Sequence, residues 1–316
     1  MKIVMLEPLG VPEEILRTKA APLERAGHTV ALCTKKMTEE EKLRAAQGAD
    51  VFIIANGKLP AAVIDAAPEL KMISVGFTGI DHVDLEACRA RDIRVCNAQG
   101  YATEATAELA VGLMLACLRH LVPYDGLARN GGVEGAFSNR VLYGKTVGVV
   151  GTGAIGRRVA ELARAFGCTV LGASRSMNPE AMALGVQYVS MEELFARSDI
   201  VTLHVPLNEW TRGLVSRERI DSMKKSAILI NCARGGVVDS AALAEALNEG
   251  RIAGAGLDVF DSEPPLPAED ALLHAKNTVV TPHTGFFTEE AMAIRADIVF
   301  ENVTAWLAGT PINVKL

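Results

Sequence analysis

The chain has 316 residues, 49% of them apolar and 22% charged, with a formal net charge of −6. This length and apolar content suit two domains of ordinary size. The negative charge and the lack of a basic run argue against a nucleic-acid or anionic-membrane surface. No apolar segment reaches membrane-spanning length. Six scattered cysteines without Cys-x-x-Cys spacing indicate reduced, buried thiols and a cytoplasmic location, and we expect no metal site.

The first half of the chain alternates short β-branched runs with helical patterns, which implies a parallel sheet wrapped by helices. Strands are expected at 3–6, 28–33, 51–55, 71–75 and 93–96, and helices at 12–26, 60–67 and 84–91. Thr38-Glu-Glu-Glu41 predicts a capping box that opens another helix. A long apolar helix over 103–120 is expected to be buried on most sides, either between domains or in a subunit interface.

The second half repeats this alternation. Strands are expected at 147–150, 169–173, 200–203, 227–231, 254–258 and 278–281, and a closing helix at 289–307. Ser190-Met-Glu-Glu193 predicts a second capping box. The predicted fold class is therefore α/β, with two Rossmann-like or flavodoxin-like domains that each contain a parallel sheet.

A glycine motif follows the strand expected at 147–150. Gly151-x-Gly153-x-x-Gly156 lies between this strand and a helix, which is the context of a dinucleotide-binding fingerprint. Gly151 permits the tight turn, Gly153 lets the backbone approach a pyrophosphate, and Gly156 lets the helix pack close to the strand. The N–H groups that begin the helix, around Ala154 and Ile155, would face the phosphates. The alternative is a glycine-rich turn that binds no ligand.

Three polar residues follow later strands. Arg234 ends the segment Ile-Asn-Cys-Ala-Arg, Glu263 follows Gly-Leu-Asp-Val-Phe-Asp-Ser, and His283 follows Val-Val-Thr-Pro. Ligands of open α/β sheets bind at the carboxyl ends of strands. Taken alone, Arg234 could form a surface ion pair and His283 could be structural. Successive strand ends, however, would bring all three residues into one crevice.

Together these residues have the chemistry needed to reduce a 2-oxo acid. Arg234 would bind the carboxylate through two parallel N–H bonds and polarise the carbonyl. His283 would donate the proton to the developing alkoxide. Glu263 would accept a hydrogen bond from the other ring nitrogen and orient the imidazole.

The order of these motifs resembles that of the D-isomer-specific 2-hydroxyacid dehydrogenases, over essentially the whole chain. The resemblance implies a substrate-binding domain made of residues 1–98 plus 288–316, with a dinucleotide-binding Rossmann domain, 99–287, inserted between them. It also implies an active site in the interdomain cleft, the Arg234, Glu263 and His283 set, and a homodimer built on the coenzyme domains. The expected activity is the NAD(P)-dependent interconversion of a 2-oxo acid and a D-2-hydroxy acid.

Further site residues are implied by local matches to the family. Thr78 and Gly79, in Ser-Val-Gly-Phe-Thr-Gly, resemble the loop that binds the substrate carboxylate, and Tyr101 resembles an active-site aromatic. Plain turn and packing roles are the alternatives. The cofactor site implied by the resemblance consists of Gly151, Gly153, Ala154, Ile155, Gly156, Ser174, Arg175, Ser176, His204, Pro206, Thr211, Cys232, Asp258, His283 and Gly285.

One departure from the family pattern concerns the choice of cofactor. NAD-specific Rossmann sites place an acid after the second strand to hold the ribose 2′-hydroxyl. Ser174 occupies that position here, followed by Arg175 and Ser176. Hydroxyls and a guanidinium can bind a 2′-phosphate, and this segment resembles that of the NADP-preferring hydroxypyruvate reductases. NADP is therefore favoured; with NAD, Arg175 would only stack on the adenine.

Two other functions remain as alternatives. The first is a phosphoglycerate dehydrogenase-type enzyme that acts on a phosphorylated hydroxy acid, which would need additional cationic side chains around the substrate. The second is a dinucleotide-sensing binding protein similar to the transcriptional co-repressors of the family, although the chain shows no basic segment for such partners. An enzyme of the hydroxypyruvate or glyoxylate reductase type is the favoured hypothesis.

Overall fold

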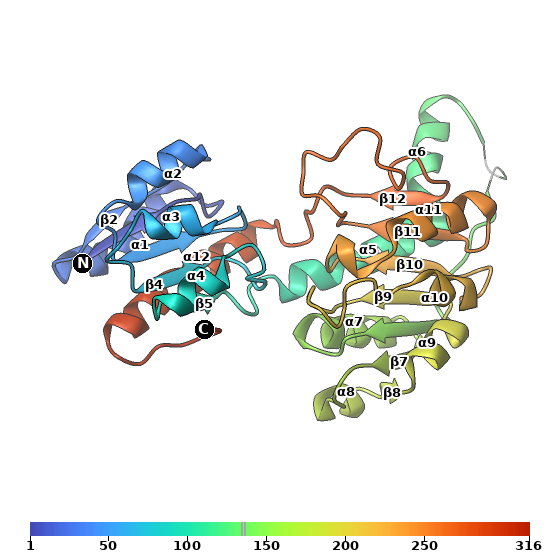
Figure 1. The fold of residues 1–316 in the computed structure, drawn as a ribbon. Helices are drawn as coiled ribbons and strands as arrows, with labels where there is room; N and C mark the ends of the chain where they lie inside the picture. Colours follow the sequence, from blue (N-terminus) through green and yellow to red (C-terminus); the bar gives the residue numbers. More distant parts are fainter. Residues whose placement is uncertain (134, 136) are drawn as a thin grey trace. The chain divides into compact units, whose positions relative to one another are not determined.

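The structure, a computed structural model, describes residues 1–133, 135 and 137–316. The chain forms two compact units (Figure 1). The first unit comprises Met1–Ala102 and Phe287–Leu316, and the second comprises Thr103–Phe286. Each unit contains one parallel sheet and its own helices, so the predicted α/β class is confirmed.

The first unit has a five-stranded sheet in the order β2-β1-β3-β4-β5. This is the flavodoxin-like order. Its strands are β1 (Lys2–Met5), β2 (Thr29–Ala31), β3 (Val51–Ile54), β4 (Met72–Val75) and β5 (Arg94–Asn97). Its helices are α1 (Glu13–Arg25), α2 (Glu39–Ala46), α3 (Ala61–Asp65), α4 (Leu85–Ala90) and α12 (Glu289–Leu307). The C-terminal helix α12 packs against α1, β4 and β5.

Local sequence signals explain these limits. Thr38 and Glu41 form the expected capping box, in which each side chain accepts a hydrogen bond from the backbone amide of the other. The strand expected at 28–33 is shorter, Thr29–Ala31, because β2 is an edge strand that pairs only with β1.

The second unit has a seven-stranded sheet in the order β12-β11-β10-β9-β6-β7-β8. Its strands are β6 (Thr146–Val150), β7 (Thr169–Ala173), β8 (Gln187–Tyr188), β9 (Ile200–Leu203), β10 (Ile228–Asn231), β11 (Gly254–Leu257) and β12 (Thr278–Val280). Its helices are α5 (Thr103–Arg119), α6 (Leu121–Arg129), α7 (Ala154–Ala165), α8 (Pro179–Ala183), α9 (Met191–Arg197), α10 (Arg217–Ser222), the 3₁₀ turn η1 (Gly235–Val237) and α11 (Ser240–Glu249). The order reverses between β6 and β9, and this switch point is where a Rossmann sheet binds its ligand.

The second capping box is only half formed. The hydroxyl of Ser190 accepts a hydrogen bond from the backbone amide of Glu193, as expected. The carboxylate of Glu193, however, forms an ion pair with Arg197 one turn further along α9. An arginine at the i+4 position competes for this side chain, and the sequence motif alone does not reveal that competition.

The long apolar helix α5 packs within the second unit, against α7 and the β10, β11 and β12 strands. It ends at Arg119 because His120 adopts a left-handed conformation, with φ of 49°, before α6 begins. Among the described residues, no single helix has the length and apolar character of a membrane span. In this described part of the chain, α5 and α6 taken together reach those values, but the pair is bent by 58°.

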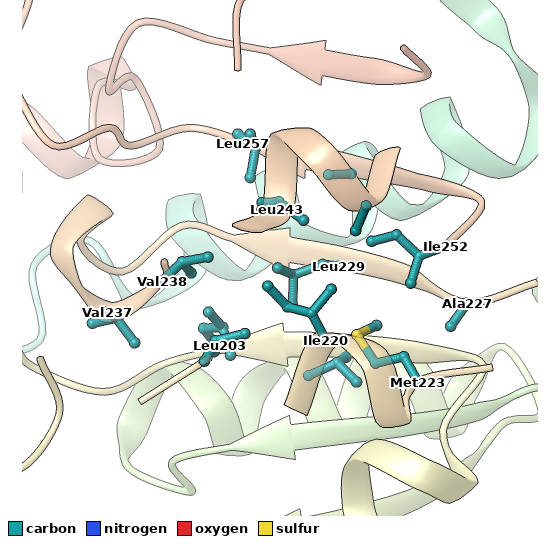
Figure 2. Close-up of a cluster of buried hydrophobic side chains, with 14 of the residues drawn as sticks. Leu203, Ile220, Met223, Ala227, Leu229, Val237, Val238, Leu243, Ile252 and Leu257 are labelled. Carbon is teal, nitrogen blue, oxygen red and sulfur yellow. The ribbon is translucent and has the colours of Figure 1, made fainter. Parts of the chain in front are cut away.

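A hydrophobic core lies beside the strands that lead to the glycine motif and to Arg234 (Figure 2). Leu203, Leu229 and Leu257 project from three neighbouring strands, β9, β10 and β11, toward Ile220 of α10 and Leu243 of α11. All five side chains are buried. Each contributes about 1.5–3 kcal/mol through burial, so the strand ends that carry polar residues rest on a rigid base.

Candidate active site

The sheet order brings the three predicted catalytic residues to one edge of the second unit. Strands β10, β11 and β12 are adjacent and parallel, so their carboxyl ends lie side by side. Arg234 follows β10, Glu263 follows β11 and His283 follows β12. The glycine motif after β6 and the loops after β7 and β9 lie at the same edge.

His283 and Glu263 form a hydrogen-bonded pair. The distance from Nδ1 of His283 to Oε2 of Glu263 is 2.6 Å. Since a carboxylate only accepts, Nδ1 is the donor. The histidine side chain is 11% exposed and the glutamate 59%. The ring of Phe286 meets the imidazole edge-on, with 5.4 Å between ring centroids. The imidazole is therefore oriented from two sides.

Asp258 organises the loop that carries His283. Its buried carboxylate accepts hydrogen bonds from Oγ1 of Thr281 at 2.6 Å, from the amide of Thr284 at 2.7 Å and from the amide of Gly285 at 2.8 Å. The family resemblance assigns Asp258 to the nicotinamide amide. The observed partners of its carboxylate lie in the 281–285 loop. Sequence reasoning missed this supporting role. An aspartate at the end of a buried strand is the only signal that could have indicated it.

Arg234 extends from a loop fixed by a buried asparagine. The amide group of Asn231 donates to the carbonyl of Arg234 at 3.0 Å and accepts from the amide of Ala233, also at 3.0 Å. A Cβ atom on Gly235 would lie 2.0 Å from the carbonyl oxygen of Phe260. This close approach brings the Arg234 loop against the segment that follows β11. Asn231, which sequence reasoning also missed, therefore positions the arginine.

The glycine motif fits the pyrophosphate of a dinucleotide. Gly151 has φ of +89°, and a Cβ atom there would lie 2.5 Å from the carbonyl oxygen of His204. A Cβ on Gly156 would lie 1.9 Å from the carbonyl oxygen of Gly151. At Gly153, the N-cap of α7, a Cβ would meet no atom within 4 Å, and no side chain caps the helix. Open space before uncapped helical N–H groups suits a phosphate.

The remaining predicted cofactor residues line the same edge. Ala154 and Ile155 form the first turn of α7, and Ser174, Arg175 and Ser176 are exposed directly after β7. The hydroxyl of Thr211 donates to the carbonyl of Pro206 in the loop after β9.

Two titratable side chains at this edge are kept neutral. Burial lowers the pKa of His204 to about 3, and its Nε2 lies 2.8 Å from Oγ1 of Thr202. Burial, and secondarily the charge of Asp258, raises the pKa of the Cys232 thiol well above its ordinary value. Both side chains thus present uncharged groups at neutral pH.

The predicted substrate-carboxylate residues belong to the first unit. The carbonyl of Thr78 accepts a 2.6 Å hydrogen bond from the side-chain amide of Asn97. The side-chain amide of Asn302, in α12, donates in turn to the backbone carbonyl of Asn97. Gly79 follows in the same half-exposed turn. This support from α12 fixes the turn that carries the backbone amides of 78 and 79.

Tyr101 is buried and lies under a guanidinium. The Cζ atom of Arg295 is 5.9 Å from the centroid of the Tyr101 ring, and the Phe77 ring is 5.8 Å away. Arg295 is itself buried and donates to the carbonyl of Leu9. Sequence reasoning missed Arg295, because its contact with Tyr101 depends on how α12 packs. Arg234, Glu263, His283 and the cofactor residues lie in the second unit, whereas Thr78, Gly79 and Tyr101 lie in the first.

Comparisons with known proteins identify relatives of this chain. The family described as "D-isomer specific 2-hydroxyacid dehydrogenase, NAD binding domain" matches residues 111–285. A D-3-phosphoglycerate dehydrogenase of Methanocaldococcus jannaschii is 40% identical over 98% of this chain, which spans 58% of that relative's length. A glycerate dehydrogenase of Methylorubrum extorquens is 40% identical, with 88% of each chain covered.

The fold is similar to that of a solved acyclic imino acid reductase in complex with NADPH and D-Arg. The two chains are 29% identical, the TM-score is 0.89, and both are covered over their whole length. The chain therefore belongs to the D-isomer-specific 2-hydroxyacid dehydrogenase family, as an oxidoreductase that uses a nicotinamide dinucleotide to interconvert a 2-oxo acid and a D-2-hydroxy acid.

Proposed function

We propose that the chain reduces a small, polar 2-oxo acid of the glyoxylate or hydroxypyruvate type, with His283 as the general acid. The observation that carries this proposal is the 2.6 Å pair of His283 and Glu263 at the strand edge where Arg234 also emerges. The match to a glycerate dehydrogenase supports this substrate size, since glycerate is the reduction product of hydroxypyruvate.

The nicotinamide dinucleotide would be held by the 151–156 loop and the N-terminus of α7, and it supplies or accepts the hydride when bound. Arg234 would bind the substrate carboxylate with its planar guanidinium. Nε2 of His283 would donate a proton to the carbonyl oxygen during reduction and accept it during oxidation. Glu263 would hold Nδ1 throughout, which keeps Nε2 aimed and stabilises the charged imidazolium.

Residues of the first unit are also proposed to contact the substrate. The backbone amides of Thr78 and Gly79 would bind the carboxylate, and the buried ring of Tyr101 would limit the space for the substrate side chain. The Asn97 side chain that holds the carbonyl of Thr78 supports this assignment, because a fixed turn presents its amides in a constant direction.

NADP is the proposed cofactor. Ser174, Arg175 and Ser176 are exposed after β7, and the segment contains no acid that would repel a 2′-phosphate. The NADPH bound by the structurally similar imino acid reductase is compatible with this preference. NAD use is the alternative outcome.

A homodimer is proposed through the α6 region of the second unit. None of the residues of α6 is buried, and Leu121, Val122, Val141 and Tyr143 are each more than half exposed. Large apolar side chains exposed to this degree are compatible with an interface. The solution mass should therefore be twice 33.6 kDa by light scattering, and Val122→Glu should give the monomer mass. A wild-type monomer would overturn this part of the proposal.

The six buried thiols support a reducing compartment, proposed to be the cytoplasm.

Initial rates test the proposed activity. NADPH and NADH oxidation would be measured separately with glyoxylate, hydroxypyruvate, pyruvate, phenylpyruvate and phosphohydroxypyruvate. Turnover fastest with NADPH and glyoxylate or hydroxypyruvate is expected. Turnover confined to phosphohydroxypyruvate would instead favour the activity named for the Methanocaldococcus relative.

His283→Ala should reduce kcat by about 10²–10⁴-fold, and Arg234→Ala should lower kcat and also raise KM. Unchanged kinetics in both variants would refute the mechanism.

A further inference from the structure

The loop that follows β7 is hydrogen-bonded at both ends to the glycine motif. At its start, the carbonyl of Ala173 accepts a 2.8 Å hydrogen bond from the amide of Gly151. At its end, the side-chain amide of Asn178 donates to the carbonyl of Thr152 at 3.2 Å. Only residues 174–177 lie between these two attachments, and they include all three predicted 2′-phosphate ligands.

The hydroxyl of Tyr188 joins the two sides of this connection. It lies 2.6 Å from Oγ1 of Thr152 and accepts a 2.9 Å hydrogen bond from the backbone amide of Asn178. Thr152 is buried, so this contact is shielded from competing water. The side-chain oxygen of Asn178 also accepts from the amide of Glu180, which fixes the asparagine in turn.

The short strand β8 positions Tyr188 in this arrangement. It pairs with β7 at Gly172 and Tyr188, which places the tyrosine ring beside the end of β7. A Cβ atom on Gly172 would lie 2.6 Å from Cγ1 of Val186 and 3.3 Å from Cγ2 of Thr152. The glycine therefore leaves room for Val186 and Thr152 beside β7.

We propose that Tyr188 and Asn178 are positioning residues for cofactor selectivity: they set the distance between the pyrophosphate loop and the Ser174-Arg175-Ser176 segment. A guanidinium and two hydroxyls bind a phosphate well only when their geometry is fixed in advance, because ordering a loose loop on binding costs affinity. This inference rests on the proposed preference for NADP. Tyr188 and Asn178 would not touch the 2′-phosphate themselves; they act through the loop.

Binding of cofactor fragments by calorimetry tests this inference without turnover. 2′,5′-ADP is 5′-AMP with an added 2′-phosphate, so these two fragments differ only in that group. Tyr188→Phe removes both hydroxyl contacts and keeps the ring. We expect the affinity for 2′,5′-ADP to fall about fivefold, which corresponds to the loss of one ordinary net hydrogen bond, and the affinity for 5′-AMP to change less than twofold. The ratio of KM for NADPH to KM for NADH should rise in parallel.

Two further variants sharpen the test. Thr152→Val breaks the same network from the other side and should give the same selective loss. Thr169→Val removes an exposed hydroxyl at the opposite end of β7 and should leave both affinities unchanged. Equal losses for the two fragments, or no loss in Tyr188→Phe and Thr152→Val, would refute the inference while leaving the NADP preference intact. Wild-type protein that binds both fragments equally would refute the preference and the inference together.

Discussion

The backbone amide of His283 donates a 2.7 Å hydrogen bond to the carbonyl oxygen of Asp258. The same aspartate binds the next two backbone amides with its carboxylate. His283 has φ of 55°, a left-handed conformation that costs a residue with a side chain about 1–3 kcal/mol. The hydrogen bonds to Asp258 offset this cost and hold the proposed acid in place.

Asp258→Asn should therefore impair both stability and turnover. One acceptor oxygen is replaced by an amide that faces backbone N–H donors, so the 281–285 loop loses part of its anchor. We expect a decrease of about 2 kcal/mol in the free energy of unfolding, the range for hydrogen bonds to a charged group. Displacement of His283 should lower kcat by about 10²-fold. Urea unfolding and steady-state kinetics measure the two effects. Asp261→Asn, at an exposed aspartate nearby, is the matched control. Wild-type values for Asp258→Asn would contradict this role.

Glu263→Gln should lower kcat more than it raises any KM. The amide keeps the size of the side chain but cannot stabilise a positive imidazolium, and its NH₂ group can turn toward Nδ1 and misalign the ring. A loss of about 10²-fold in kcat is expected, with the KM for the dinucleotide unchanged. Glu269→Gln, an exposed glutamate in the same segment, serves as the control. Equal kcat values in Glu263→Gln and Glu269→Gln would show that the 2.6 Å pair has no catalytic role.

Two alanine substitutions should separate ligand binding from folding in the glycine motif. A methyl group on Gly153 meets no atom of the protein within 4 Å, so Gly153→Ala should keep the wild-type Tm and lose dinucleotide affinity. A methyl group on Gly156 would lie 1.9 Å from a backbone oxygen, so Gly156→Ala should lower the Tm by several degrees. Differential scanning fluorimetry with and without NADPH distinguishes the two variants. A stable Gly153→Ala protein with full affinity would argue against a phosphate in this space.

The fold was largely predictable because buried parallel strands are continuous apolar runs. The expected limits of the strands at 169–173 and 200–203 and of the helix at 289–307 are those observed. The strand β8 was missed because two half-exposed residues carry no periodic signal. This short strand nevertheless places Tyr188 beside the glycine motif.

The candidate site was predictable only to the level of strand ends. Arg234, Glu263 and His283 follow three successive strands, and parallel pairing is enough to bring such residues to one edge. The supporting contacts of Asn231 and Asp258 depend on which backbone amides face a side chain, and no sequence pattern encodes that direction. The contact between Arg295 and Tyr101 depends on the packing of α12 against a distant segment.

His204 should make the stability of the protein depend on pH. Its pKa is about 3 in the folded protein and about 6.5 in an unfolded chain. Below pH 6.5 the unfolded state therefore binds a proton that the folded state does not, so acidification favours unfolding until the pH reaches about 3. At pH 5 this linkage lowers the free energy of unfolding by about 2 kcal/mol relative to pH 8.

His204→Gln keeps an acceptor for the hydroxyl of Thr202 and removes the titration. The free energy of unfolding in urea, measured from pH 8 to pH 5, should fall about 2 kcal/mol further in the wild type than in His204→Gln. Curves that stay parallel down to pH 5 would show that His204 takes up its proton in the folded protein.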